Sequence, residues 1–415
     1  GAQHEDQTGS GDVHSARDLY FDPFLTCHHP GITTIEAHLA KAIELVAPPR
    51  KRARRGVDAA NHAALVAALA ANLALAVVMG HSPPLVAVPL RKPEGKRSRY
   101  EPSGFRQLAT GALLLAEAGV VDLVKSKKRG KASTIEPVPD LVAKILALDD
   151  LSPASFGRVE GEETIILART TVDLYTQDRE SEQVDYADTP ETRRFRAEMR
   201  RINDHLAHAD VAYVGPPRDE NGRLLDPSPR MRFLHRTFNI HAPRRTTKAQ
   251  LPPVTDAEKR FDRGGRLYHR GVFWQQLSRD LRRHVRIDGE ETAYLDFASM
   301  YLRLALLSVG MEPPDGDLYR TIAGIETDEH RDGIKKVLNA MLFRKDALER
   351  LPRGTKPLLP ESLRSARAVS EAIKSAFPAL ASVFGTRKGF ELTFIESQIL
   401  VAALLRLNEK GITAL

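Results

Sequence analysis

The fold of this chain depends on one stretch of sequence, Tyr294-Leu295-Asp296-Phe297-Ala298-Ser299-Met300-Tyr301-Leu302-Arg303. It follows turn-forming residues at 287–290 and begins with aromatic and branched side chains, which is typical of a hairpin strand. From residue 300 to residue 309, leucines occupy most sides of a predicted helix. We therefore expect a strand that ends at Asp296 and passes into a buried helix. That rigid support would hold the carboxylate where it can bind a hard cation.

The same stretch resembles motif A of the family A DNA polymerases and of the related phage-type single-subunit polymerases. In that family an Asp at the end of a palm strand is followed by an aromatic residue, by a bulky residue five places on, and by an Arg seven places on. Asp296, Phe297, Tyr301 and Arg303 stand at those places.

The resemblance covers the chain from about residue 256 to residue 415. Upstream of motif A, residues 264–268, 274–277 and 282–283 resemble the family's Gly-Arg-Leu, Leu-Gln and Ile-Arg elements. Downstream, residues 330–343 resemble motif B, the fingers helix that carries Arg, Lys and an aromatic residue at four-residue steps. The resemblance implies palm and fingers subdomains in a right-hand arrangement.

The family's motif C, a strand followed by a His-Asp pair, would supply a second metal carboxylate. The sequence ends at Leu415, where that strand would begin. We therefore expect it to be a truncated product that stops before motif C. The alternative is a polymerase relative without a complete metal site.

Template-directed polymerisation is an in-line attack of a 3′-hydroxyl on an α-phosphate, in which the protein mainly supplies position and charge. Two Mg²⁺ (or Mn²⁺) ions about 3.5–4 Å apart clamp the attacking and leaving oxygens. The resemblance implies that Asp296 is the first metal carboxylate. The Phe297 carbonyl would be a further oxygen ligand, in keeping with the preference of Mg²⁺ for oxygen.

On a helix, Arg331, Lys335, Asn339 and Phe343 form one stripe, because they follow one another at four-residue steps. The resemblance implies that Arg331 and Lys335 bind the triphosphate and that Phe343 stacks on the nucleotide. The register is open by one residue, since Lys336 with Asn339 also reproduces the family's Lys-x-x-Asn pattern. The alternative is an exposed amphipathic helix with ordinary cations.

Tyr301 occupies the place of a family glutamate that blocks a ribose 2′-hydroxyl, so deoxynucleotides are the expected substrates; the alternative is a core tyrosine. Five residues before motif A would line the DNA duplex: Arg266, Gln275, Arg282, Arg283 and Arg286. Trp274 is expected to pack in the palm rather than to stack on a base.

The composition of the whole chain agrees with a nucleic-acid partner. Its 415 residues predict two to three domains, and 61 basic against 54 acidic residues give a net charge of +7. The single cysteine, Cys27, excludes an intrachain disulfide framework. No Walker-type phosphate loop is present, which argues against an NTPase motor. The apolar run at 63–79 predicts a buried core helix and no membrane partner.

The N-terminal part is predicted to contain an arm and a small module. Residues 1–56 would be a disordered, basic arm, and residues 57–150 a winged-helix-like module for DNA binding. The expected order is a helix at 61–79, a strand at 85–90, a candidate recognition helix at 105–119 and a hairpin. The hairpin carries the cations of the wing, Lys125, Lys127, Lys128 and Arg129. The alternative is a small α/β domain with a solvated lysine loop.

Residues 151–250 are expected to form a helical, thumb-like connecting region. Thr189 would cap an arginine-rich helix that continues to about residue 209. Residues 251–415 would form the incomplete palm and fingers. The predicted fold class is therefore α+β, multidomain and mostly helical.

These features together predict a cytoplasmic, template-directed nucleotidyltransferase that adds deoxynucleotides to a primer 3′-hydroxyl in DNA replication or repair. Its partners would be DNA, as primer-template duplex or single strand, and nucleoside triphosphates. The alternative is a non-catalytic nucleic-acid-binding protein, such as a regulator or replication accessory factor, on a degenerate polymerase scaffold.

Overall fold

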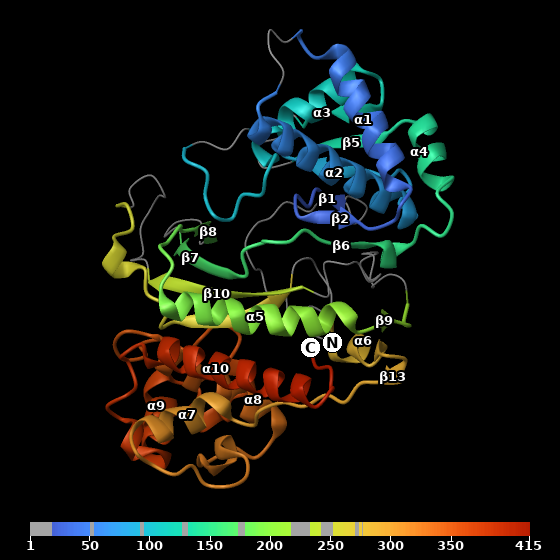
Figure 1. Cartoon of the computed structure of the whole chain (residues 1–415). Coiled ribbons are helices and arrows are strands. Elements are labelled where there is room, and N and C mark those ends of the chain that lie inside the picture. Colours follow the sequence, from blue (N-terminus) through green and yellow to red (C-terminus); the bar gives the residue numbers. More distant parts are fainter. Residues whose placement is uncertain are drawn as a thin grey trace.

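Three hydrophobic cores organise the computed structural model, which describes residues 19–49, 54–91, 95–126, 132–172, 179–216, 233–241, 252–269, 274–275 and 277–415. Figure 1 shows an N-terminal module in blue, a central sheet in green and yellow, and a helical lobe in orange and red. The mixed α and β composition in several parts agrees with the predicted fold class.

The N-terminal module places helices against a four-stranded sheet of order β1-β3-β5-β4. The strands of this sheet are β1 (Leu19–Tyr20), β3 (Val86–Val88), β4 (Val121–Val124) and β5 (Ser133–Pro137). The module also contains β2 (Leu25–Cys27), which lies outside this sheet. Its helices are α1 (Ile32–Val46), α2 (Gly56–Val78), α3 (Leu108–Glu117) and α4 (Pro139–Leu146). The predicted order from the first helix to the hairpin is confirmed.

Helix α2 is long and apolar enough to cross a membrane by length and composition. Most of its apolar window is buried, and Leu65, Leu69 and Leu73 belong to the N-terminal core. The helix therefore has the environment predicted for a core helix.

The prediction of a disordered arm over residues 1–56 is wrong for the part that the structure describes. Residues 19–49 form β1, β2 and α1, and α1 buries one apolar face that includes Ile32, Ile35, Leu39 and Ile43. Their three- and four-residue spacing is the signal for this helix. Arg54 forms an ion pair with Glu44 at 2.6 Å. Residues 1–18 and 50–53 lie outside the described residues.

The central part is a sheet of order β11-β10-β7-β8, covered by α5. Its main strands are β7 (Ile165–Val172), β8 (Arg179–Gln183), β10 (Leu234–His241) and β11 (Gly264–His269), and α5 spans Pro190–His208. The small strands are β6 (Phe156–Arg158), which pairs with β2, and β9 (Val211–Tyr213), β12 (Val285–Ile287) and β13 (Glu290–Glu291).

This sheet corrects two predictions. Residues 151–250 are not mainly helical, because β7, β8 and β10 lie there. The boundary predicted at 250/251 divides the sheet, since β10 pairs antiparallel with β11. Such pairing joins distant segments and leaves little trace in local sequence patterns. The predicted start of α5 is confirmed, because the Thr189 hydroxyl accepts a hydrogen bond from the Thr192 amide at 3.1 Å.

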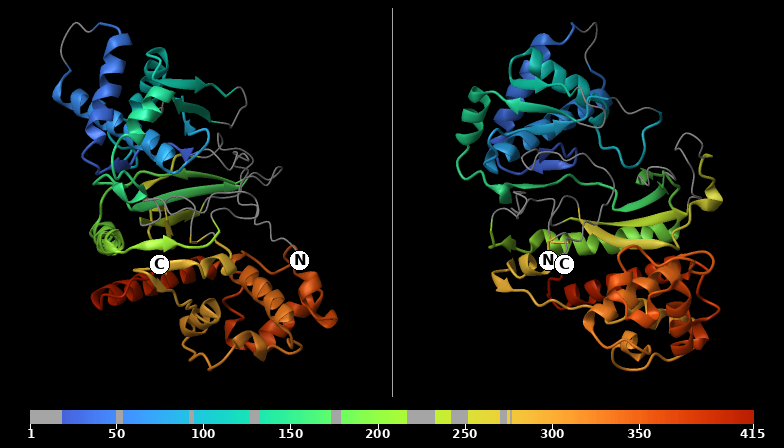
Figure 2. Two further views of the ribbon diagram at one scale, coloured as in Figure 1. Left: turned by 90° about the vertical axis from the view of Figure 1, so that its right-hand side faces the viewer. Right: turned by 180° about the vertical axis from the view of Figure 1, so that it is seen from behind.

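The helical lobe consists of α7 (Met300–Ser308), α8 (Asp328–Phe343), α9 (Ala366–Ala376) and part of α10 (Lys388–Glu409). Leu392 of α10 is buried in the core of this lobe, whereas Val401 and Leu404 are buried in the central core. Helix α10 therefore joins the two cores, and Figure 2 shows it along their boundary. The helices predicted at 300–309 and 330–343 are confirmed as α7 and α8.

The strand predicted to end at Asp296 is not formed. Strand β13 ends at Glu291, and residues 292–298 have no regular secondary structure. Leu295 is 90% exposed and Tyr294 is 61% exposed. The aromatic and branched side chains therefore lack the packing partners that favour a strand.

The Arg236 side chain lies at the junction of the central sheet with α5 and α10. It is fully buried, and its guanidinium donates hydrogen bonds to the Gly265 carbonyl at 3.0 Å and to Ser397 and Gln398 of α10 at 3.2 Å each. Glu198 of α5 forms an ion pair with it at 3.2 Å. Burial lowers the pKa of Arg236 to about 10, so the side chain remains charged at neutral pH.

Replacing Arg236 with alanine is expected to destabilise the central core by about 3–5 kcal/mol, because it breaks a buried ion pair and leaves hydrogen-bonding groups without partners. The only tryptophan, Trp274, lies in this core, so its fluorescence during urea unfolding reports the loss.

Arg201→Ala is the matched control, because Arg201 lies on α5, the helix that carries Glu198, and pairs with Glu409 in an exposed position. This substitution should lower the free energy of unfolding by less than about 1 kcal/mol. Equal urea midpoints for the Arg236 and Arg201 variants would contradict this interpretation.

Candidate functional site

Side chains from four elements that are distant in sequence meet at one place. The polar ones are Arg266 of β11, Tyr301 of α7, and Thr393 and Glu396 of α10. The fourth element, α8, contributes the aromatic Phe343. The Arg266 guanidinium donates to Glu396 at 2.9 Å and to the Tyr301 hydroxyl. The Tyr301 hydroxyl lies 3.2 Å from the Glu396 carboxylate and 3.1 Å from the Thr393 hydroxyl. We call these five residues the β11–α10 cluster.

The hydroxyl of Tyr301 is fully engaged in this cluster. A phenol has one proton to donate and two lone pairs that accept, so Arg266, Thr393 and Glu396 together match its capacity. Burial raises the pKa of Tyr301, so the hydroxyl stays protonated at neutral pH and donates to the carboxylate. The ring is consequently fixed at its polar end.

Aromatic contacts fix the other side of the cluster. The Tyr301 and Phe343 rings meet edge to face with centroids 5.6 Å apart, and Phe343 meets Phe390 in the same way at 5.2 Å. Gly389 is required here, because a Cβ on it would lie 2.6 Å from the Phe343 ring. Helix α10 therefore packs directly against the end of α8.

The other residues of the α8 stripe have different environments. Arg331 forms an ion pair with Asp317 at 2.5 Å and lies over the Tyr319 ring at 5.3 Å. Lys335 is exposed and has no hydrogen bond or ion pair with any described residue, whereas Lys336 is half-buried. The buried Asn339 Oδ1 has no hydrogen-bond partner among the described residues. Lys335 is thus the lysine available to a ligand, which favours the first of the two registers.

Asp296, the predicted metal carboxylate, is exposed and forms no hydrogen bond or ion pair with the described residues. Within the same residues, no group of three His, Cys, Asp or Glu side chains could hold a metal ion. The assignment of Asp296 and the neighbouring Phe297 carbonyl as metal ligands therefore stays a prediction. The backbone after them is strained, since Ser299 has φ +53° at the start of α7.

Three of the side chains predicted to line a duplex bind the protein's own groups. Gln275 donates to the Leu267 carbonyl at 3.0 Å, Arg282 to the Leu277 carbonyl at 2.9 Å, and Arg286 to the Arg283 carbonyl at 2.8 Å. These contacts hold the segment around α6 (Arg279–Arg282) in place. That these residues line a duplex stays a prediction.

The Arg283 side chain is exposed and forms no hydrogen bond or ion pair with the described residues. Trp274 is buried in the central core.

The proposed wing lies mostly outside the described residues, which include neither Lys127, Lys128 nor Arg129; Lys125 is exposed. Strands β4 and β5 pair antiparallel, and β5 also pairs with β3. Helix α3 itself carries no lysine or arginine, so its exposed face is chemically poor for phosphate contacts.

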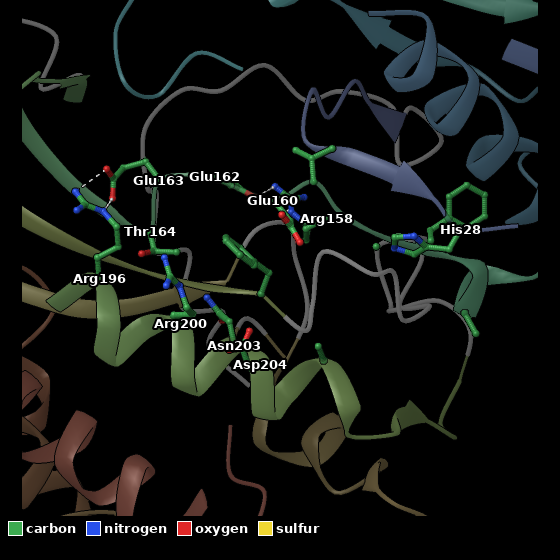
Figure 3. A pocket seen from close by; sticks show the side chains of 17 residues that line it. His28, Arg158, Glu160, Glu162, Glu163, Thr164, Arg196, Arg200, Asn203 and Asp204 are labelled. Carbon is green, nitrogen blue, oxygen red and sulfur yellow. Dashed lines mark hydrogen bonds and ion pairs between the residues drawn. The ribbon is translucent and has the colours of Figure 1, made fainter. Parts of the chain in front are cut away.

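Sequence reasoning missed a pocket of about 790 Å³ between the N-terminal module and α5. Figure 3 shows Arg196, Arg200, Asn203 and Asp204 on α5 at one side of this pocket, with Arg158 across from them. Arg158 forms an ion pair with Glu162 at 2.5 Å, and both side chains are almost fully buried.

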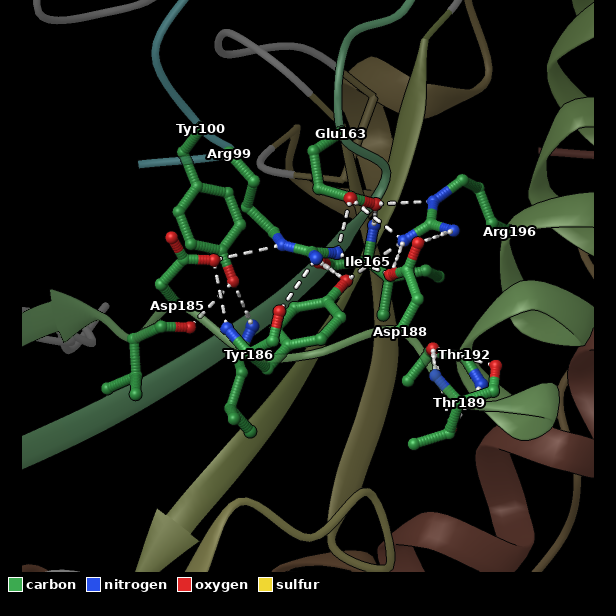
Figure 4. A network of polar contacts seen from close by, with 12 residues as sticks. Arg99, Tyr100, Glu163, Ile165, Asp185, Tyr186, Asp188, Thr189, Thr192 and Arg196 are labelled. Atoms are coloured by element: carbon green, nitrogen blue, oxygen red, sulfur yellow. Dashed lines mark hydrogen bonds and ion pairs between the residues drawn. The ribbon is translucent and has the colours of Figure 1, made fainter. Parts of the chain in front are cut away.

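Next to the pocket, a polar network joins the N-terminal module to the sheet (Figure 4). Glu163 pairs with Arg99 at 3.1 Å and with Arg196 at 3.0 Å, and the Arg99 guanidinium lies 3.7 Å from the centre of the Tyr186 ring. The signal for this network was the acidic pair at 162–163 opposite an arginine-rich helix. The network therefore has a structural role, because it connects the N-terminal module to the central sheet.

Comparison of this chain with protein-family models, with curated proteins and with solved structures found no match.

Replacing Gly389 with alanine is expected to destabilise the helical lobe by about 1–3 kcal/mol, because the new methyl group would overlap the Phe343 ring. Thermal unfolding followed by circular dichroism measures the loss. Adding Phe343→Leu should recover most of it, since the smaller side chain gives the methyl group room.

Gly56→Ala is the control, because a Cβ there would meet nothing within 4 Å. Strictly additive effects of Gly389→Ala and Phe343→Leu would show that the two residues do not interact.

Proposed function

We propose that this chain is a template-directed nucleotidyltransferase of the family A DNA polymerase type, with the β11–α10 cluster in its nucleotide site. The observation that carries the proposal is the convergence of Arg266, Tyr301 and Phe343. The resemblance assigns these residues to three separate motifs, and they lie in one set of contacts. A chance likeness in short motifs gives no reason for these side chains to meet.

The spacing along α8 suits a nucleotide. Lys335 and Phe343 are eight residues apart on one face, which corresponds to about 12 Å along the helix axis. A triphosphate bound at the Lys335 ammonium would leave its base near the Phe343 ring. Because Lys335 is exposed without an ion pair to the described residues, it keeps its charge available for phosphate.

Binding of nucleic acid has independent support. The net charge of +7 favours a polyanionic partner, and Arg279 and Arg283 are exposed beside the segment that leads to Asp296. Arg266 is 47% exposed even within its ion pair, so one face of its guanidinium can reach a primer-template duplex.

Lys335→Ala is expected to weaken binding of a non-hydrolysable deoxynucleoside triphosphate about tenfold or more, because a charged hydrogen bond contributes about 1.5–3 kcal/mol. Fluorescence anisotropy on a primer-template in the presence of Mg²⁺ measures the affinity. Lys374→Ala, an exposed lysine of α9, is the matched control and should leave the affinity unchanged. An equal loss in both variants would point to nonspecific attraction.

Primer extension tests the chemistry separately. The 415-residue chain and the product of the complete reading frame that encodes it are assayed on a primed DNA template with Mg²⁺. Any extension observed should disappear in Asp296→Ala, since this residue holds the place of the first metal carboxylate. Unchanged extension by that variant would remove the assignment.

A second candidate is a nucleic-acid-binding protein without turnover. The exposed, unpaired state of Asp296 and the lack of a metal-binding group among the described residues favour it. Salt-sensitive DNA binding, together with no extension by either form, would support this candidate.

A further inference from the structure

We infer that Thr393 and Glu396 of α10 are positioning residues that fix Tyr301 and thereby make the nucleotide site select deoxyribose over ribose. This inference rests on the proposed function. It assigns a role to two residues of a helix for which the sequence indicated no site residue.

The location of Tyr301 relative to Phe343 connects it with the sugar. A base stacked on the Phe343 ring places its own sugar beside that ring, and the Tyr301 ring centroid is 5.6 Å from that of Phe343. With the base stacked in this way, the inference places the ribose 2′-hydroxyl against the Tyr301 ring. To exclude that hydroxyl, the ring must stay in place when a ribonucleotide enters.

The polar contacts of the Tyr301 hydroxyl keep the ring in place. Glu396 accepts from it at 3.2 Å, and the Thr393 hydroxyl lies 3.1 Å away. Arg266 closes the group by donating to both Glu396 and Tyr301. Since Glu396 is the carboxylate shared by Arg266 and Tyr301, loss of its charge weakens both contacts.

The positions of Thr393 and Glu396 are themselves set by the fold. Gly389, Thr393 and Glu396 follow one another at four- and three-residue steps, so they share a face of α10. The adjoining Ser397 is bound by the buried Arg236 guanidinium at 3.2 Å. A shift of α10 as a whole would therefore disturb the central core.

Strand β11 approaches α10 closely enough for Arg266 to reach Glu396. The preceding residue, Gly265, has φ +80°, and a Cβ on it would lie 2.7 Å from the Ser397 hydroxyl. Glycine is therefore needed at this position for both its backbone conformation and its close contact.

The test measures binding of an α,β-imido deoxynucleoside triphosphate and of its ribose counterpart to the protein on a primer-template. Thr393→Val and Glu396→Gln keep the approximate shape of each side chain while weakening its contact with Tyr301. Both variants should lower the preference for the deoxynucleotide about tenfold. The lower preference should arise because the ribonucleotide binds more tightly, and any loss of deoxynucleotide affinity should be smaller than this gain. Tyr301→Phe, which keeps the ring and lacks the hydroxyl, should behave like Thr393→Val.

Glu391→Gln is the control, because the exposed Glu391 lies on the same helix and pairs with Lys388 instead. Its preference should equal that of the unmodified protein. Trp274 fluorescence verifies that each variant retains the central core.

The possible failures are distinguishable. If both affinities fall together in the Thr393 and Glu396 variants, or if the ratio does not change, the two residues have only a structural role and the inference is overturned. If the unmodified protein binds neither nucleotide, the proposed function itself fails, and this inference fails with it.

Discussion

The buried charge of Arg236 is the constraint on which the arrangement of the central sheet and the helical lobe depends. Removing a guanidinium from water is costly unless its hydrogen bonds are replaced. Four groups on three elements supply the replacement: Glu198 of α5, the Gly265 carbonyl of β11, and Ser397 and Gln398 of α10. The Phe195 and Phe238 rings flank the charge at 4.7 and 5.1 Å. A shift of any one element leaves a buried donor without an acceptor, so these contacts permit one relative position of sheet and helix.

Helix α10 also fixes the relative positions of the residues in the candidate site. Its first half contributes Leu392 to the core of the helical lobe, and its second half contributes Val401 and Leu404 to the central core. Between them lie the residues that contact the β11–α10 cluster and Arg236. The helix therefore fixes Arg266 of the sheet relative to Tyr301 and Phe343 of the lobe, which is the preorganisation that a binding site requires.

Local signals were sufficient to predict the helices at α2, α7 and α8, the start of α5 and the hairpin of the N-terminal module, because periodicity and capping lie within a few residues. The pairing of β10 with β11 was missed because it joins segments separated by a long connection. The burial of Arg236 was not predicted, since sequence does not distinguish a buried arginine from an exposed one. Arg266, Tyr301 and Phe343 were found by resemblance, whereas Thr393 and Glu396 were missed because an ordinary helical pattern gives polar residues no assigned partner.

The β11–α10 cluster and Asp296 differ in how well the surrounding residues hold them in place. The β11–α10 cluster has its charges paired, its hydroxyl satisfied and its aromatic rings in contact, so its geometry exists before any ligand arrives. Asp296 has none of these supports, and Leu295 beside it is 90% exposed. An apolar side chain so exposed contributes no burial energy, and the segment at 292–298 enters α7 through the strained Ser299. In the proposed function, nucleotide binding therefore rests on contacts that the folded core already makes, whereas Asp296 lies in a segment without regular secondary structure.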